Sequence, residues 1–224
     1  FGGQFVSTLP LRGLPEYLRD TYPVNKVTAS LEVFFMGSSY SVSHNRHALK
    51  FILREVAPYM HKNYPGRFKF NIIGRKMPPE YAVYIQNNVR YCGYVDDLDG
   101  FLAGMDIAII PSFFGAGMQQ KIFEPLCRGI PTVTSVRGLA GYPFEHRKEI
   151  WLAENLISFI EGLLYLEDET NRKNMGGAGR FKAEKIFSRE ALDILVSSGL
   201  QKLFSLPEGN PRYSIHSSSS RLYI

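Results

Sequence analysis

Apolar residues along the chain follow two patterns: short continuous runs, and longer stretches in which they recur every three or four positions. The short runs, each bounded by turn-forming residues, span 32–36, 68–74, 88–95, 107–110, 131–136 and 149–153. The clearest periodic stretch is 45–64, whose apolar side chains fall on one helical face. Short apolar runs are typical of buried strands and periodic stretches of amphipathic helices, so strands and helices are predicted to alternate.

The remaining helices are predicted from start and stop signals as well as from periodicity. Prolines begin a short helix at 79–86, and a pair of aspartates caps one at 96–104. Further helices are predicted at 118–128, 156–166, 169–187 and 189–204. Gly176, Gly177 and Gly179 lie inside the third of these, and each costs about 1 kcal/mol there relative to alanine. We therefore expect that helix to kink or split.

The repetition of strand, helix and strand predicts the fold class, which is α/β with a right-handed, doubly wound, Rossmann-like parallel sheet. Residues 1–31 are rich in proline and glycine and predict an irregular lead-in or interdomain linker. Residues 32–205 form the predicted domain, and residues 206–224, with their run of serines, a mobile tail. Because the chain starts with Phe1 rather than methionine, we expect a processed or excised fragment.

The stretch 106–137 contains the strongest candidate for a binding site. It is predicted to form a strand, a turn, a helix and a strand, and parallel sheets bind ligands where strand ends meet helix starts. Gly115 and Gly117 remove side chains that would block a phosphate from the unpaired N–H groups of the helix start. Lys121 and Glu124 share one helix face. They could bind phosphate and sugar hydroxyls, or form a surface ion pair with each other.

Composition and charge exclude several classes of protein. The net charge of +5 is ordinary for a globular chain, and no nucleic-acid partner is predicted. No apolar run reaches the roughly 18 to 20 residues of a membrane span, and no charged-then-apolar leader is present in the sequence given. Cys92 and Cys127 lie far apart in apolar segments, which predicts buried, reduced thiols and neither zinc nor a disulfide.

Two weaker patterns favour a structural explanation. His44 and His47 are spaced as helical metal ligands could be, but no carboxylate or third histidine accompanies them. They predict a solvated helix start and no metal site. Residues 176–180, GGAGR, neither follow a strand nor open a helix, and no GxGxxG follows residues 32–36. A nicotinamide enzyme is therefore not predicted.

Basic side chains gather on the helix predicted at 169–187. They are Arg172, Lys173, Arg180, Lys182 and Lys185. Such a run is usually a solvated helix face, and that is our prediction. Contact with an anionic membrane that carries a lipid acceptor is the alternative left open.

Residues 115–135, GAGMQQKIFEPLCRGIPTVTS, resemble the signature of the C-terminal, nucleotide-sugar-binding domain of GT-B glycosyltransferases of the family 4 type. Members read roughly G-x-G-x-x-x-K-x-x-E-x-x-x-x-G-x-P-V-V, and the matching residues are Gly115, Gly117, Lys121, Glu124, Gly129, Pro131 and Val133. The segments FFMGSSYSVSHNR, FNIIGR, NVRYCGYVDDL and DIAIIPS resemble the first four strands of that domain, in the same order. The similarity covers about residues 32–203.

The resemblance implies a single domain equivalent to the C-terminal half of a GT-B enzyme. This domain would be the donor-binding half of a retaining glycosyltransferase. The whole enzyme would move a sugar from a nucleoside diphosphate sugar to an acceptor hydroxyl. The resemblance implies no cofactor and no required metal. It also implies a missing N-terminal acceptor-binding domain or subunit. The location it implies is cytoplasmic, and peripheral contact with a membrane is left open.

The resemblance also assigns roles to residues of this chain. Glu124 would contact the ribose hydroxyls, and Lys121 the diphosphate, as the two candidate catalytic residues. The backbone N–H groups of Gly117, Met118 and Gln119 would bind the diphosphate as well. The main chain of Val95 would meet the base. Gly37, Ser38 and Arg46, after the first strand, are further candidates for binding the nucleotide sugar. The arginine and lysine that many relatives use on the phosphates are missing there, so Ser38 and Arg46 would be weak substitutes and Lys121 is the better candidate.

One departure from the family pattern concerns the donor sugar. The first glutamate of the family's E-x7-E motif would fall at Ala116, so its contact to the sugar is expected to be absent or replaced. Two other functions therefore stay open. A nucleotide-sugar epimerase of the same architecture would also use a glutamate at the helix start. A non-catalytic module could have kept the fold while serving to bind a partner.

Overall fold

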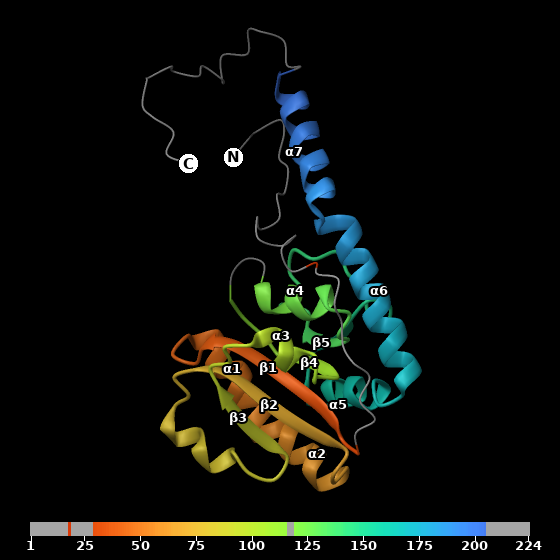
Figure 1. Ribbon diagram of the computed structural model, residues 1–224. Helices are drawn as coiled ribbons and strands as arrows, with labels where there is room; N and C mark the ends of the chain where they lie inside the picture. The colour runs from red at the N-terminus through yellow and green to blue at the C-terminus, as the bar shows by residue number, and fades with distance from the viewer. Residues whose placement is uncertain (1–17, 19–28, 116–118, 205–224) are drawn as a thin grey trace.

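The computed structural model describes residue 18, residues 29–115 and residues 119–204, and it contains a six-stranded sheet. The strands are β1 (Leu31–Ser39), β2 (Phe68–Arg75), β3 (Val89–Gly93), β4 (Ile107–Ile110), β5 (Thr132–Ser135) and β6 (Trp151–Ala153). Their order is β3-β2-β1-β4-β5-β6, and each neighbouring pair is parallel (Figure 1). The predicted doubly wound α/β fold is confirmed, with its topological switch point between β1 and β4.

Helical segments connect the first five strands. They are α1 (Ser43–Phe51), η2 (Ile52–Val56), α2 (Ala57–Asn63), η3 (Pro79–Tyr84), α3 (Leu98–Leu102) and α4 (Gln120–Cys127). After β6 come α5 (Leu156–Tyr165), α6 (Glu169–Phe187) and α7 (Arg189–Phe204). The helix predicted at 45–64 is present, but its middle part η2 is π-helical. Pro58 explains the wider turn, because proline has no N–H and its ring crowds the carbonyl four residues earlier.

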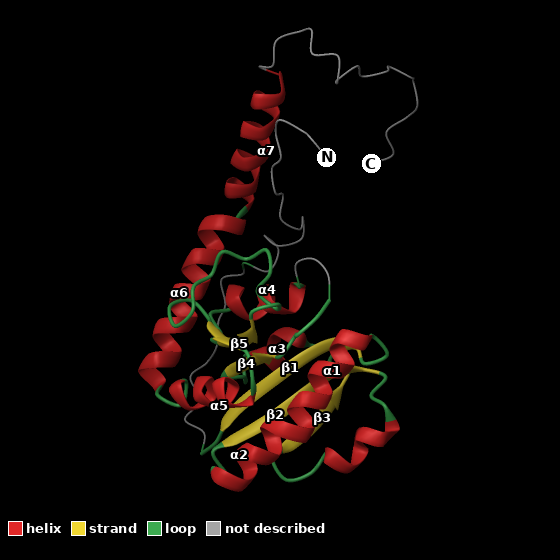
Figure 2. Cartoon of the chain, turned by 180° about the vertical axis from the view of Figure 1, so that it is seen from behind, coloured by secondary structure: helices red, strands yellow, loops and turns green. Residues whose placement is uncertain are grey.

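The sheet is covered on both faces. Along β1, Val33 and Phe35 belong to one core cluster and Phe34 to the other, as the alternation of side chains in a strand requires. The first cluster lies under α1, η2, α2 and α5, and the second under α3, α4 and the end of α6 (Figures 1 and 2). Two buried layers leave only the strand ends open to ligands.

The predicted split of the helix at 169–187 is wrong, because α6 runs unbroken over 19 residues. Its glycines serve close packing. A Cβ on Gly176 would lie 2.0 Å from the carbonyl oxygen of Gly129, and one on Gly179 would lie 2.9 Å from that of Glu149. Gly177, in contrast, has nothing within 4 Å of its Cβ position. The backbone contacts of α6 thus outweigh the low helix propensity of glycine.

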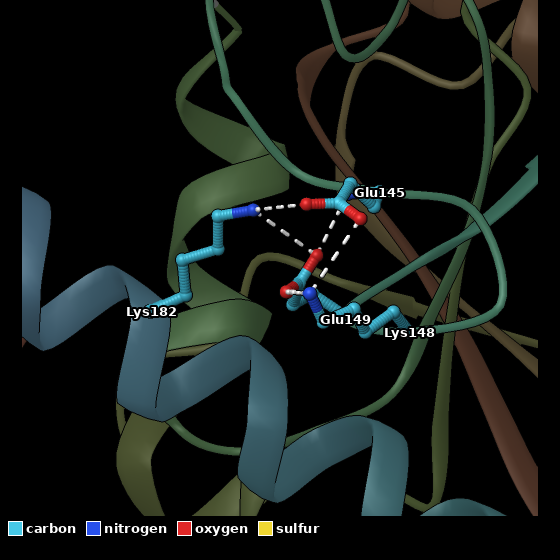
Figure 3. A network of polar contacts seen from close by, with 4 residues as sticks. All are labelled: Glu145, Lys148, Glu149 and Lys182. Carbon is cyan, nitrogen blue, oxygen red and sulfur yellow. Dashed lines mark hydrogen bonds and ion pairs between the residues drawn. The ribbon is translucent and has the colours of Figure 1, made fainter.

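Three of the basic side chains of α6 bind partners outside the helix. Arg172 donates to the carbonyls of Leu166 and Glu167, and Arg180 donates to that of Cys127. Lys182 joins Glu145 and Glu149 in a network that also includes Lys148 (Figure 3). These contacts dock α6 on the domain, so the predicted solvated face holds for the exposed Lys173 and Lys185 and not for the other three. Contact with a membrane stays an untested alternative. Among the described residues, none of the helices is long and apolar enough to cross a bilayer.

Both cysteines have free thiols, and Cys127 is buried whereas Cys92 is half-buried.

The predicted lead-in, residues 1–31, lies mostly outside the described residues, although Leu18 packs against the second core cluster. The predicted tail, residues 206–224, lies wholly outside them. The three-part division of the chain therefore stays a prediction.

Candidate functional site

The backbone of the turn after β4 accepts hydrogen bonds from the end of β5 and from the residues that follow it. Gly115 has a φ of 123°, a conformation that favours glycine. Its carbonyl accepts a hydrogen bond of 2.9 Å from Nε of Arg137, which follows β5. The hydroxyl of Ser135 also donates to the carbonyl of Ser112 at the start of this turn. These bonds fix the backbone at the carboxyl edge of the sheet, just before α4 begins.

Lys121 extends from the first turn of α4 across the switch point to the neighbouring loop. Its Nζ lies 2.8 Å from Oδ1 of Asn45, in the first turn of α1. Asn45 is only 3% exposed, and its Nδ2 donates to the carbonyl of Ser39 at the end of β1, at 3.1 Å. The ammonium also lies 5.5 Å from the centre of the Phe35 ring. The end of β1, the start of α1 and the start of α4 thus meet at one cation.

This cation is partly desolvated. Burial lowers the pKa of Lys121 to about 8. His44, beside Asn45 on α1, is half-buried rather than solvated as predicted, and its pKa is lowered by burial and by the charge of Lys121. An ideal Cβ on Gly115 would lie 3.8 Å from the His44 ring and 3.6 Å from Nε2 of Gln119. A partly desolvated ammonium in the first turn of a helix, at the carboxyl edge of a parallel sheet, favours an anion.

Glu124 is one turn further along α4 and is buried. One of its oxygens, Oε1, lies 3.2 Å from Nη2 of Arg128, and the same guanidinium nitrogen lies 2.6 Å from Oδ1 of Asp99. Arg128 therefore joins α4 to the start of α3. The sequence predicted that Lys121 and Glu124 would share a face, and each finds a different partner there. Whether Glu124 contacts a ribose stays a prediction.

A cavity of about 340 Å³ opens beside the cation, at the carboxyl ends of β1 and β2 and in the loop after β3. It is lined by Met36, Gly37, Ser38, Ile73, Gly74, Arg75, Tyr94, Val95 and Leu98. The Arg75 guanidinium lies 4.0 Å from the centre of the Tyr94 ring, which is 60% exposed. Ser38 lines the cavity, and the next residue, Ser39, holds Asn45. An ideal Cβ on Gly37, which lines the cavity, would lie 3.4 Å from Cγ of Asn45. The cavity therefore lies next to the residue that binds Lys121.

The structure brings together some of the predicted site residues and leaves others apart. Gly37, Ser38 and Val95 line the cavity, and Gly115, Gln119 and Lys121 surround the turn after β4. Arg46 is exposed on α1 and is not part of the lining described.

Residues 116–118, between Gly115 and Gln119 in the chain, lie outside the described residues. They are Ala116, Gly117 and Met118, so their predicted roles stay predictions. Gln119, which follows, is 9% exposed, and its backbone carbonyl accepts from the Tyr142 hydroxyl at 3.1 Å. Its Oε1 has no hydrogen-bond partner within the described part of the chain.

Sequence reasoning missed Asn45, Arg75, Tyr94 and Arg137. Arg75 and Tyr94 come at or just after the carboxyl ends of β2 and β3, and Arg137 shortly follows β5. Polar or aromatic side chains at these positions were a usable signal, because ligands of parallel sheets bind at that edge. Asn45 carried no comparable signal, since its partner Lys121 is 76 positions away.

The family model described as glycosyl transferases group 1 matches residues 30–168, which is more than half of the chain. The chain belongs to this family. A search of curated proteins returns no sequence match.

Solved structures with the same fold include several glycosyltransferases. HepE from Anabaena, solved with UDP and glucose, has a TM-score of 0.60 at 16% identity, over 80% of this chain and 49% of its own. Sucrose-phosphate synthase from Thermosynechococcus elongatus has a TM-score of 0.61 at 16% identity, over 88% and 49%. The C-terminal domain of a group 1 glycosyl transferase from Francisella tularensis (LpcC) has a TM-score of 0.57 at 12% identity, over 81% and 96%.

The group 1 domain described here thus spans about half the length of HepE and of the synthase, and nearly all of the isolated Francisella domain. Its fold is the Rossmann-like fold of GT-B glycosyltransferase domains. At the carboxyl edge of its sheet, a partly desolvated lysine adjoins a cavity that has an apolar floor and an arginine and a tyrosine at its rim. Chemically, this arrangement suits a ligand with a flat or apolar part joined to an anion.

Proposed function

We propose that this group 1 domain is the donor-binding half of a retaining glycosyltransferase of the family 4 type. It would bind a nucleoside diphosphate sugar whose sugar moves to an acceptor hydroxyl. The observation that carries the proposal is the Lys121 ammonium at the switch point, next to a cavity large enough for part of a nucleoside. HepE, whose fold is similar, was solved with UDP and with UDP-glucose, which supports the ligand class.

The parts of the ligand follow from the chemistry of the two pockets. The base and ribose would occupy the cavity near Val95 and Tyr94, where an aromatic ring and backbone groups meet. The diphosphate would lie at the start of α4, where the helix dipole and Lys121 both favour negative charge. Glu124 would accept hydrogen bonds from the ribose hydroxyls.

The proposed reaction needs the protein to stabilise a leaving group. The bond between the sugar C1 and the diphosphate oxygen breaks as the acceptor oxygen bonds to C1, and the acceptor proton leaves with the diphosphate. Negative charge therefore grows on the diphosphate in the transition state. Lys121, placed before the reaction in a partly desolvated pocket, would stabilise that charge without reorganisation. This electrostatic role requires no metal.

The acceptor side of the reaction would come from elsewhere. This chain corresponds in length and fold to the isolated C-terminal domain from Francisella, and to half of HepE. We propose that an N-terminal domain or a separate subunit binds the acceptor and supplies the remaining catalytic groups. The chain by itself would bind the donor and would not transfer the sugar.

Calorimetry with UDP, GDP, ADP and dTDP tests the proposal. We expect one of them to bind the 224-residue chain, and Lys121→Met and Glu124→Gln each to weaken that binding by roughly tenfold or more, because each removes a charged hydrogen-bonding group. Lys182→Met is the matched control, since Lys182 is also a partly buried helical lysine but pairs with Glu145 and Glu149. It should bind like the unaltered chain.

Two results would redirect the proposal. No binding of any of the four nucleotides at millimolar concentration would favour the partner-binding module, which the alanine at position 116 supports. Conversion of a nucleotide sugar into its epimer by the chain would favour the epimerase. Transfer of sugar to an acceptor by this chain alone would contradict the half-enzyme part of the proposal.

A further inference from the structure

Both the oxygen and the nitrogen of the buried Asn45 amide form hydrogen bonds within the candidate site. Oδ1 accepts from Lys121 Nζ at 2.8 Å, and Nδ2 donates to the Ser39 carbonyl at 3.1 Å. A flipped amide would turn its NH2 group toward the ammonium and its oxygen toward the carbonyl, and both contacts would be repulsive. The two partners therefore fix one orientation of the amide, with its oxygen toward the cation.

The surroundings of Lys121 make this amide important. β1 presents the Phe35 ring to the ammonium, and α1 presents Asn45 and the titratable His44. On its own helix, Glu124 is paired with Arg128. Next to the turn after β4, Arg137 binds the Gly115 carbonyl. Across the described residues no carboxylate lies within ion-pair distance of Lys121 Nζ, so a neutral amide is its hydrogen-bond acceptor.

We propose that Asn45 is a positioning residue for the donor diphosphate: it holds the Lys121 ammonium at the carboxyl edge of the sheet without neutralising it. This inference rests on the proposed function and deepens it. A carboxylate at position 45 would hold the lysine equally well, but it would cancel the charge that attracts a phosphate. No acceptor at all would leave a long, flexible side chain to find its own position. The amide provides orientation and keeps the positive charge.

The proposal predicts how binding depends on pH. An acceptor beside an ammonium favours its charged form, so the identity of residue 45 sets the pKa of Lys121. In Asn45→Ala that pKa should fall, and the loss of nucleotide affinity at alkaline pH should begin at lower pH than in the unaltered chain. In Asn45→Asp it should rise, and the loss should begin at higher pH. A side chain with a merely structural role would not shift this midpoint in opposite directions.

The experiment measures UDP binding to the 224-residue chain by calorimetry between pH 6 and 10, with GDP, ADP or dTDP in its place if one of those binds better. At pH 7 we expect Asn45→Ala and Asn45→Asp each to bind about tenfold more weakly, the first because the cation is no longer held and the second because its charge is cancelled. The opposite shifts of the alkaline midpoint distinguish the two causes.

Asn71→Ala is the matched control. Asn71 is also 3% exposed and donates hydrogen bonds from its amide, to Glu32 Oε2 at 2.7 Å and to the Val33 carbonyl at 3.4 Å, but it lies within β2 and away from the cavity lining. We expect a loss of thermal stability similar to that of Asn45→Ala, with unchanged UDP affinity and midpoint.

The outcomes separate this inference from the function on which it rests. If the unaltered chain binds nucleotide and the Asn45 variants keep its affinity and its midpoint, the positioning role is overturned and the proposed function stands. If Asn71→Ala weakens binding as much as Asn45→Ala does, the effect is one of stability and the inference also fails. If no nucleoside diphosphate binds the unaltered chain, both are overturned.

Discussion

Two partly buried lysines of this domain have opposite surroundings. Lys182 on α6 lies 3.3 Å from Glu145 Oε1 and 3.3 Å from Glu149 Oε2, in a network that also contains Lys148 (Figure 3). Lys121 on α4 has an amide oxygen as its acceptor and an aromatic ring beside it. The charge of Lys182 is balanced by two carboxylates, whereas Lys121 has a neutral hydrogen-bond acceptor, as the proposed binding of an anion requires.

The electrostatic consequences differ in the same way. Hydrogen bonding to Lys182, with the charge of Lys148, lowers the pKa of Glu145 and so keeps that carboxylate ionised. Burial lowers the pKa of Lys121 to about 8, and no carboxylate of the described residues offsets its desolvation. The ion network around Lys182 stabilises the packing of α6 on the domain. The desolvated ammonium of Lys121 instead lowers the stability of the fold, and a bound anion would offset that loss. The predictions that follow separate the docked region from the site.

The largest effect on stability is expected where α6 packs against Gly129, in the turn after α4. Gly176→Ala places a methyl group 2.0 Å from the Gly129 carbonyl oxygen, so the two backbones must move apart. We expect the free energy of unfolding to fall by about 2–4 kcal/mol. Gly177→Ala, whose Cβ meets open space, should instead raise it by about 0.5–1 kcal/mol. Urea unfolding followed by circular dichroism measures both, and equal effects would contradict the close packing of α6.

Replacing each lysine by methionine tests whether Lys182 stabilises the fold and Lys121 binds the ligand. Lys121→Met removes a desolvated charge, so unfolding should cost about 1 kcal/mol more while UDP binds at least about tenfold more weakly. Lys182→Met leaves Glu149, whose side chain is 5% exposed, with less compensation, so unfolding should cost about 1–2 kcal/mol less. UDP affinity should stay unchanged in that variant. Loss of stability in both variants would show that Lys121 is also a structural residue.

The pH dependence of Lys121 gives the next prediction. Its folded-state pKa of about 8 lies below its ordinary value of 10.5, so the fold penalises the charged form. That penalty is fully present below pH 8 and disappears as the pH rises toward 10.5. The stability gap between Lys121→Met and the unaltered chain should therefore close over this interval. UDP affinity should fall over the same range, by up to about tenfold for each pH unit above 8.

The smallest effect is expected at the rim of the cavity. Tyr94→Ala removes a ring that is 60% exposed and stacks with Arg75, so we expect UDP to bind about three- to tenfold more weakly. Pyrophosphate, which has no base to place in the cavity, should bind the variant as it binds the unaltered chain. A parallel loss of both ligands would show that the cavity is not a separate subsite for the nucleoside.

Much of the fold could be predicted from local patterns. The strand at 107–110 was predicted with the bounds that β4 has, because an aspartate and a proline flank a run of four apolar residues. The other strands were predicted to within a few residues. The predicted break in α6 failed because helix propensity is a local quantity. The contact that makes Gly176 favourable comes from Gly129, which is distant in sequence.

The candidate site was predictable only in part. The glycine turn, Lys121 and Glu124 come from one continuous stretch, and the resemblance to a family supplied Val95 and the end of β1. Asn45 could not be found in this way, because its role depends on a hydrogen bond between two helices on opposite sides of the switch point. His44 was taken for a solvated residue for the same reason. Its neighbour Gly115 is 71 positions away in the sequence and is brought close only by the fold.

The most direct test of the central claim is an NMR titration of the Lys121 side chain in the 224-residue chain, with its signals assigned from Lys121→Met. The account predicts an alkaline pKa near 8 without ligand, because the charge is buried and left without a carboxylate. Saturating UDP should raise that pKa, since a phosphate beside the ammonium favours its charged form. An ordinary lysine pKa in the free chain, or a pKa that UDP leaves unchanged, would contradict the claim that this cation is kept for the diphosphate.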